Sequence, residues 1–233
     1  MIILAVGAHP DDVEICCFGT LAKCTRRGDT VIVCSVSNGN LGHHTIDPAS
    51  LRPKRMAEGA KASQVIGASF CCLDVNDTYI DSTDTALRKK LTELIRSVKP
   101  DVIITHDNSD YHNDHIETNR LVSYCLTHAS LANVATENPP LDKIVALYYM
   151  DKVGGGTFIP TEYVDISETF TLKLQALACH VSQLDFLKEH DGIELLHAVE
   201  VHAEYRGMFC RVRYAECFRS CTERPVAPIR LLP

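Results

Sequence analysis

Short apolar runs rich in valine and isoleucine alternate with longer amphipathic stretches over roughly the first two thirds of the chain. The runs that read as strands are 2–7, 30–36, 69–73, 101–105 and 143–150, and the helical stretches between them are about 12–27, 50–66 and 85–98. These helical stretches stop at Gly28, at Gly67 and before Pro100. The alternation predicts an α/β fold of the Rossmann-like, doubly wound class, a mostly parallel sheet flanked by helices on both faces.

The pattern changes after Met150, where a small extension of helices and strands is predicted. Three consecutive glycines, Gly154 to Gly156, indicate a flexible connection. The elements expected beyond them are a strand at 160–166, a long helix from Ser167 to about His190, a shorter helix at about 193–205 and an edge strand at 211–218. We therefore expect one domain over 1–233, with a core at about 1–150 and a C-terminal extension at about 151–233.

The composition is that of an ordinary soluble protein, with 45% hydrophobic residues, 23% charged residues and a formal net charge of -7. Because no block of consecutive Lys or Arg interrupts this acidic balance, the chain offers no basic surface for nucleic acid. The apolar stretch from Met1 to Ala8 is too short to span a bilayer, and no charged segment precedes it. We expect a cytoplasmic protein with no membrane span and no nucleic-acid partner.

The chain contains eleven cysteines, a number that fits disulfides, a metal cluster or buried small side chains. The count is odd, two pairs are vicinal, and no Cys-x-x-Cys occurs, so neither a disulfide framework nor a zinc ribbon is indicated. We interpret most of them as core residues in a reducing compartment.

The first predicted strand runs directly into His9, Pro10, Asp11 and Asp12. Aspartate is a favoured N-cap, and an acidic first turn complements the helix dipole, which accounts for one of the carboxylates. It accounts for neither the second carboxylate nor the imidazole. Open α/β sheets place their ligand sites at the carboxyl ends of central strands, so we interpret this cluster as functional.

A second polar cluster, His106 to His115, follows the fourth predicted strand. In the common doubly wound order the first and fourth strands are neighbours, so both clusters rise into one crevice. Histidine and aspartate without cysteine suit a catalytic zinc site, in which three protein ligands leave a position for water. Asp11 is placed to take a proton from that water, His112 to hold an oxyanion or protonate the leaving amine, and Asp114 to orient an imidazole.

The segment Ala8 to Glu14 resembles the signature of the PIG-L/LmbE-like N-acetylglucosamine deacetylases, and Tyr111 to His115 resembles that family's second metal motif. Similar blocks recur in the family's order along nearly the whole chain: 19–22, 38–42, 55–67, 99–102, 177–183 and 214–218. The resemblance implies an enzyme with Zn²⁺ on His9, Asp12 and His115. It further implies assembly into a homo-oligomer, a trimer or a hexamer.

The resemblance also implies roles for four further side chains. Asp11 is the general base, and His112 stabilises the oxyanion or acts as the acid with Asp114 as its partner. Arg55 matches an arginine that faces the substrate in several members, although an Arg three residues before Glu58 also fits a surface ion pair.

Three features of the chain are not assigned by the family pattern. Phe18 stands where many members have glycine, the loop with His43 and His44 does not align, and His180 lies in a family block without a role.

The leading hypothesis is zinc-dependent hydrolysis of the acetyl group on an N-acetylated amino sugar or its conjugate, which gives acetate and a free amine. A metal-dependent phosphoesterase and a non-enzymatic sugar-binding module remain as alternatives. A dinucleotide-binding site is disfavoured, because the first strand ends without Gly-x-Gly-x-x-Gly.

Overall fold

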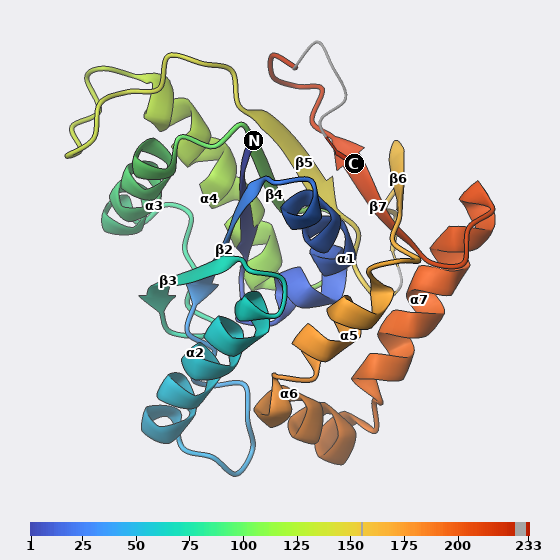
Figure 1. Cartoon of the computed structure of the whole chain (residues 1–233). Coiled ribbons are helices and arrows are strands. Elements are labelled where there is room, and N and C mark those ends of the chain that lie inside the picture. The colour runs from blue at the N-terminus through green and yellow to red at the C-terminus, as the bar shows by residue number, and fades with distance from the viewer. Residues whose placement is uncertain (155, 227–231) are drawn as a thin grey trace.

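A seven-stranded sheet forms the centre of the computed structural model, which describes residues 1–154, 156–226 and 232–233 (Figure 1). Its order is β3-β2-β1-β4-β5-β7-β6. The strands are β1 (Ile2–Gly7), β2 (Thr30–Ser37), β3 (Ser69–Val75), β4 (Val102–His106), β5 (Ala146–Met150), β6 (Glu162–Asp165) and β7 (Ala215–Ser220). Strands β1 to β5 are parallel, and β7 runs antiparallel to both of its neighbours. The predicted doubly wound, mostly parallel α/β fold is confirmed.

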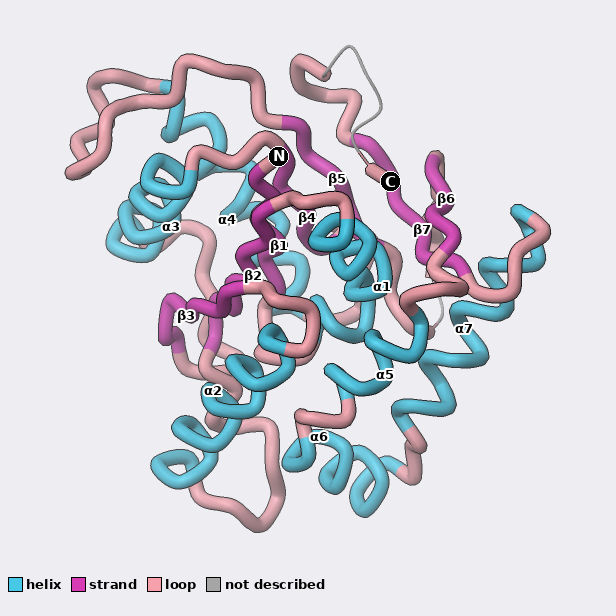
Figure 2. The backbone as a smooth tube through the Cα atoms, in the orientation of Figure 1, coloured by secondary structure: helices cyan, strands magenta, loops and turns pink. Residues whose placement is uncertain are grey.

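Helices cover both faces of this sheet (Figure 2). They are α1 (Asp12–Arg26), α2 (Pro48–Gln64), α3 (Thr85–Val98), α4 (Asn113–Ser130), α5 (Phe170–Leu177), α6 (Val181–Phe186), a π-helical turn η1 (Leu187–Asp191) and α7 (Leu195–Cys210). Side chains alternate along β1, so that Ile3 packs with α1 and α5 while Leu4 packs with α3 and α4. Both are fully buried, as expected for a central parallel strand.

Two predictions for the C-terminal extension are wrong. The long helix expected from Ser167 to His190 is divided into α5, α6 and η1, because the chain turns at His180 and buries that imidazole beside Glu14 of α1. The last strand is not at the edge: β7 lies between β5 and β6, and its first four residues are all buried. In addition, α4 was not assigned from the sequence, and Gly155 of the predicted glycine connection lies outside the described residues.

The C-terminal extension is tied to α1 by a buried carboxylate on β7. Glu216 accepts hydrogen bonds from the backbone N–H groups of Gly19 and Thr20 and from Lys173 Nζ at 2.6–2.9 Å. Gly19 is required here, since a Cβ would stand 2.9 Å from Ile166. These contacts fix the helix that carries Asp12.

The parallel pairing of β1 with β4 brings the two polar segments together. Val6 is opposite Thr105 in this pairing, so both strands end at the same edge of the sheet. All eleven cysteines are free thiols. Within the described residues, no helix combines the length and the apolar character that crossing a bilayer requires.

Candidate active site

A side chain at the end of the turn between β1 and α1 bonds back to the backbone at its start. Asp12 is the first residue of α1, and its Oδ2 accepts the backbone N–H of His9 at 2.7 Å. A carboxylate in the first helical turn is stabilised by the helix dipole. This local bond holds the His9 ring and the Asp12 carboxylate on one side of the turn.

His9, Asp12 and His115 come together although the third is contributed by α4. His9 Nδ1 lies 3.3 Å from Asp12 Oδ2, and His115 Nε2 lies 3.3 Å from Asp12 Oδ1. One nitrogen or oxygen atom from each lies within 4.8 Å of the others, a spacing that fits a single metal ion. Two imidazoles and one carboxylate are a ligand set typical of catalytic zinc.

Each of these imidazoles has a carboxylate on its other nitrogen. His9 Nε2 lies 3.0 Å from Asp77 Oδ1 and 3.2 Å from Asp114 Oδ2. His115 Nδ1 lies 3.0 Å from Asp110 Oδ2. Metal-binding histidines commonly use such carboxylates to fix their orientation and raise their basicity. Each ring thus presents one nitrogen to Asp12 and holds the other on an acidic partner.

Asp114 occupies a different position from the one that the resemblance implied. Its carboxylate lies against His9 and accepts the backbone N–H of Thr78 at 2.8 Å. Its hydrogen bond with His112 is made by the backbone, because the N–H of Asp114 donates to His112 Nδ1 at 3.2 Å. His112 is the N-cap of α4, and this bond leaves its Nε2 free to carry the proton.

The electrostatics of the cluster favour an ionised Asp12. Burial by itself raises the pKa of a carboxyl group, but the nearby His115, His106 and His9 hold the pKa of Asp12 well below its ordinary value. For His115, burial by itself lowers the pKa, but the nearby Asp12 raises it, and the pKa of His115 reaches about 9. Asp12 is therefore a carboxylate at neutral pH.

Asp11 binds Arg55. Asp11 Oδ1 accepts from Arg55 Nη2 at 2.9 Å, and both side chains are buried. The alternative of a surface pair between Arg55 and Glu58 is wrong, because Glu58 instead accepts from the N–H and hydroxyl of Ser182. Asp11 and Arg55 both line the same pocket as the trio.

The structure adds three residues that the sequence analysis did not assign to the site. His106, the last residue of β4, stacks on His115 with ring centroids 4.0 Å apart and accepts the backbone N–H of Ala8 at 3.0 Å. Burial and the neighbouring His115 lower the pKa of His106 to about 4. Asp110 and Asp77 are the acidic partners already described. Asp110 had a signal, since it stands in the same polar loop as His115, whereas Asp77 follows β3 and had none.

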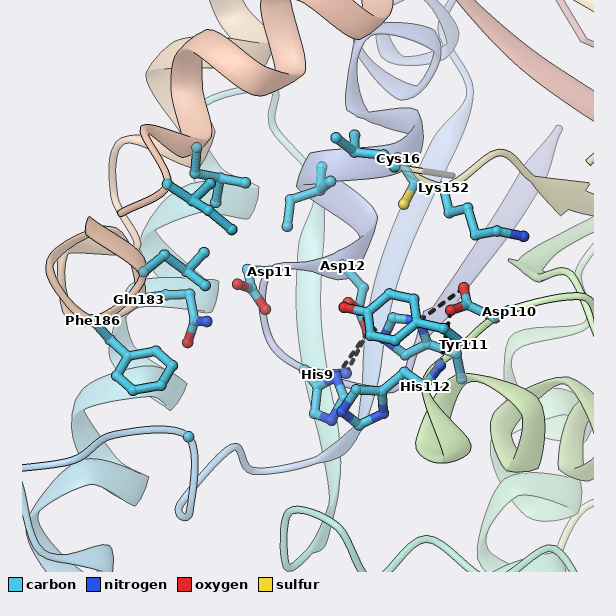
Figure 3. Close-up of a pocket in the computed structure, with 18 of the residues that line it drawn as sticks. His9, Asp11, Asp12, Cys16, Asp110, Tyr111, His112, Lys152, Gln183 and Phe186 are labelled. Carbon is cyan, nitrogen blue, oxygen red and sulfur yellow. Dashed lines mark hydrogen bonds and ion pairs between the residues drawn. The ribbon is translucent and has the colours of Figure 1, made fainter. Parts of the chain in front are cut away.

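A cavity of about 660 Å³ opens beside the cluster (Figure 3). Figure 3 shows Phe186 and Gln183 across this cavity from His112 and Tyr111. His180 does not line the cavity: it is fully buried, with Nε2 3.6 Å from Glu14 Oε1. His43 and His44 stack on each other at 5.1 Å, and each ring lies 5.7 Å from Phe186 at the rim.

Comparisons with known proteins agree with this fold and identify a family. A model of the family described as PIG-L, GlcNAc-PI de-N-acetylase, matches residues 4–126. The diacetylchitobiose deacetylase of Thermococcus kodakarensis is 28% identical over 230 residues, which cover 93% of this chain and 82% of the relative. The conserved protein TT1542 of Thermus thermophilus superposes with a TM-score of 0.82 at 26% identity and covers 98% of each chain.

A hydratase shares the same fold. The 4-carboxy-2-hydroxymuconate hydratase of Pseudomonas putida has a TM-score of 0.85 at 21% identity, over 98% of this chain and 99% of the hydratase. The fold alone therefore does not determine the reaction.

The histidine and aspartate side chains gather at the carboxyl ends of β1 and β4, which is where open α/β sheets place their ligand sites. The family match covers more than half of the chain, and the chain belongs to the PIG-L family. The protein is an N-deacetylase.

Proposed function

We propose that the protein hydrolyses the acetyl group of an N-acetylated amino sugar or its conjugate, with Zn²⁺ held by His9, Asp12 and His115. The observation that carries the proposal is the pairing of both imidazoles, each with one nitrogen toward Asp12 and the other on a carboxylate. This donor set fits zinc, because it supplies three nitrogen and oxygen ligands and no thiolate. When bound there, zinc would polarise the amide carbonyl and lower the pKa of a bound water to roughly 7.

Asp11 is assigned the proton transfer. Its second carboxylate oxygen is free of the Arg55 bond, and the residue lines the cavity next to Asp12. The hydrogen bond from Arg55 orients the carboxylate, which a general base requires. The proton taken from water then passes to the nitrogen of the leaving amine.

His112 is assigned to the oxyanion of the tetrahedral intermediate. Since its Nδ1 accepts the N–H of Asp114, the ring proton sits on Nε2 and is available to donate. Burial and the neighbouring His9 and His115 lower the pKa of His112, which favours a neutral donor over an imidazolium acid. Asp114 supports the site by orienting His9.

A two-metal phosphoesterase is less well supported. The matching family model and the Thermococcus relative are both deacetylases, which favours amide hydrolysis. The groups of side chains that could hold a metal do not decide the number of ions, because His9, His112 and Asp114 share no residue with His106, Asp110 and His115.

Asp11→Asn tests the assignment of roles. We expect the variant to lose at least about 100-fold in kcat, the low end of the usual effect of a general base, while its zinc content stays that of the wild type. Asp142→Asn, the same change at an exposed loop position, is the control and should leave acetate release unchanged. Near-normal acetate release by Asp11→Asn on every N-acetyl sugar tried contradicts the mechanism.

The wider setting follows from the same proposal. Eleven free thiols suit a reducing compartment, which supports a cytoplasmic location. The proposed substrate is a small molecule. We further propose a homo-oligomer, a trimer or a hexamer, which light scattering on the purified protein measures directly.

A further inference from the structure

We call His9, Asp12 and His115 the metal cluster. The side of the cavity that faces it is built from apolar side chains. We call this surface the apolar wall; its residues are Ile15, Phe186, Leu187, Ile193 and Leu195. They come from α1 and from the segment α6–η1–α7 of the C-terminal extension. The wall and the metal cluster therefore line one continuous cavity although most of the wall is supplied by a different part of the chain.

Part of this wall is accessible, although Leu195 is buried in an apolar cluster against which Ile15 and Leu187 pack. Ile193 is 42% exposed, and Phe186 and Leu187 are half-buried. Contiguous apolar side chains that stay open beside a polar cluster are typical of a ligand-binding surface. A cavity of about 660 Å³ also has room for more than the acetamide end of a sugar.

The charges of the cavity do not suit an anionic ligand. Its lining holds five carboxylates, those of Asp11, Asp12, Asp77, Asp110 and Asp191. Apart from the imidazoles around the proposed metal position, the cationic side chains among the described lining residues are Arg55 and Lys152, and both are engaged. Arg55 binds Asp11, and Lys152 Nζ donates to the carbonyl oxygen of Ser109 at 2.7 Å.

One polar group stands at the wall. The side-chain oxygen of Gln183 is buried and has no hydrogen-bond partner among the described residues. It lies on the same side of the cavity as Phe186 in Figure 3. An unpaired buried acceptor is costly unless a ligand supplies a donor, and a sugar hydroxyl does so.

We propose that the apolar wall binds an uncharged alkyl or aryl group carried by the amino sugar, and that the preferred substrate is such a hydrophobic N-acetylglycosaminide. Phosphorylated and nucleotide-linked sugars are then poor substrates, because they bring charge to a wall without a free cation. This inference rests on the proposed deacetylation. It adds the chemical nature of the group that the sugar carries away from its acetamide.

A series of n-alkyl N-acetyl-β-D-glucosaminides tests the wall with acetate release as the readout. Each methylene buried there is expected to raise kcat/KM about two- to fourfold, so the butyl glycoside exceeds the methyl glycoside by roughly tenfold or more. UDP-N-acetylglucosamine and N-acetylglucosamine 1-phosphate are expected to fall below the methyl glycoside.

Ile193→Asn removes part of the wall without touching the metal cluster. It should flatten the dependence of kcat/KM on chain length. Ile159→Asn is the matched control, because Ile159 is 74% exposed and does not line the cavity. It should keep the wild-type dependence.

The outcomes separate the two proposals. Acetate release with no dependence on chain length, or a preference for the nucleotide sugar, overturns the apolar subsite and leaves deacetylation standing. If no N-acetyl sugar is hydrolysed, calorimetric titration with n-alkyl β-glucosides, which carry no amide, decides the subsite alone. Affinity that rises with chain length and falls in Ile193→Asn supports the wall, and affinity without that trend overturns it.

Discussion

Asp110→Asn tests whether the carboxylate behind His115 prepares that ring for a metal ion. Asp110 Oδ2 lies 3.0 Å from His115 Nδ1, and the Asp110 side chain is only 2% exposed. The contact fixes a proton on Nδ1, so Nε2, the atom 3.3 Å from Asp12, is the nitrogen that gives up its proton to bind a metal ion. Loss of such a partner lowers metal affinity by about 10- to 100-fold, or about 1.4–2.7 kcal/mol.

The assay is a competition titration for zinc against a chromophoric chelator at neutral pH, with a thermal melt to establish that each variant is folded. Asp107→Asn is the control, because Asp107 stands in the same loop but pairs with Arg219 at 2.7 Å and does not contact His115. The reasoning predicts that only Asp110→Asn weakens binding. Equal zinc affinities in the two variants refute it.

Two further predictions concern stability. Lys173→Met leaves the carboxylate of Glu216 buried without its cation, so it should lower the free energy of unfolding by about 3–5 kcal/mol in urea titrations. Adding Glu216→Gln should restore part of this loss. A loss below about 1 kcal/mol contradicts the prediction. Burial by itself raises the pKa of Asp107, but hydrogen bonds from Ser109 and Arg219 lower it below its ordinary value. The ionised carboxylate of Asp107 therefore stabilises the fold. This stabilisation is complete above about pH 4 and is lost as the pH falls through the folded-state pKa. The difference in unfolding free energy between wild type and Asp107→Asn should therefore shrink on acidification, and a difference that grows argues against it.

The central part of the fold could be predicted because its signals are local. Strand β1 is an uninterrupted apolar run, and β2 is mostly apolar and mostly buried. Glycine or proline follows each of the helical stretches between the predicted strands. The adjacency of β1 and β4 followed from the usual doubly wound order, and the pairing of Val6 with Thr105 confirms it.

The C-terminal extension could not be predicted as well, because tertiary contacts override its local pattern. Apolar residues continue at helical spacing from α5 into α6, yet the chain turns at His180 to bury the imidazole beside Glu14. Strand β7 is interior because β6, earlier in the chain, covers its outer side. Neither arrangement has a signature in the sequence of the segment itself.

The same distinction applies to the site. His9, Asp12 and His115 were predicted as a group from two short motifs, and the structure brings them together. The acidic partner Asp77 is 68 residues from His9 in the chain and reaches it only because β3 and β1 end at the same edge of the sheet. Contacts of this kind depend on the assembled sheet, so spacing along the chain does not indicate them.

The most direct test of the central claim is acetate release from N-acetyl amino sugars by protein loaded with zinc, measured before and after chelation. The account predicts acetate and free amine in equal amounts, no release once zinc is removed, and recovery when one equivalent of zinc per chain is restored. Undiminished release from protein shown to be free of metal contradicts the account.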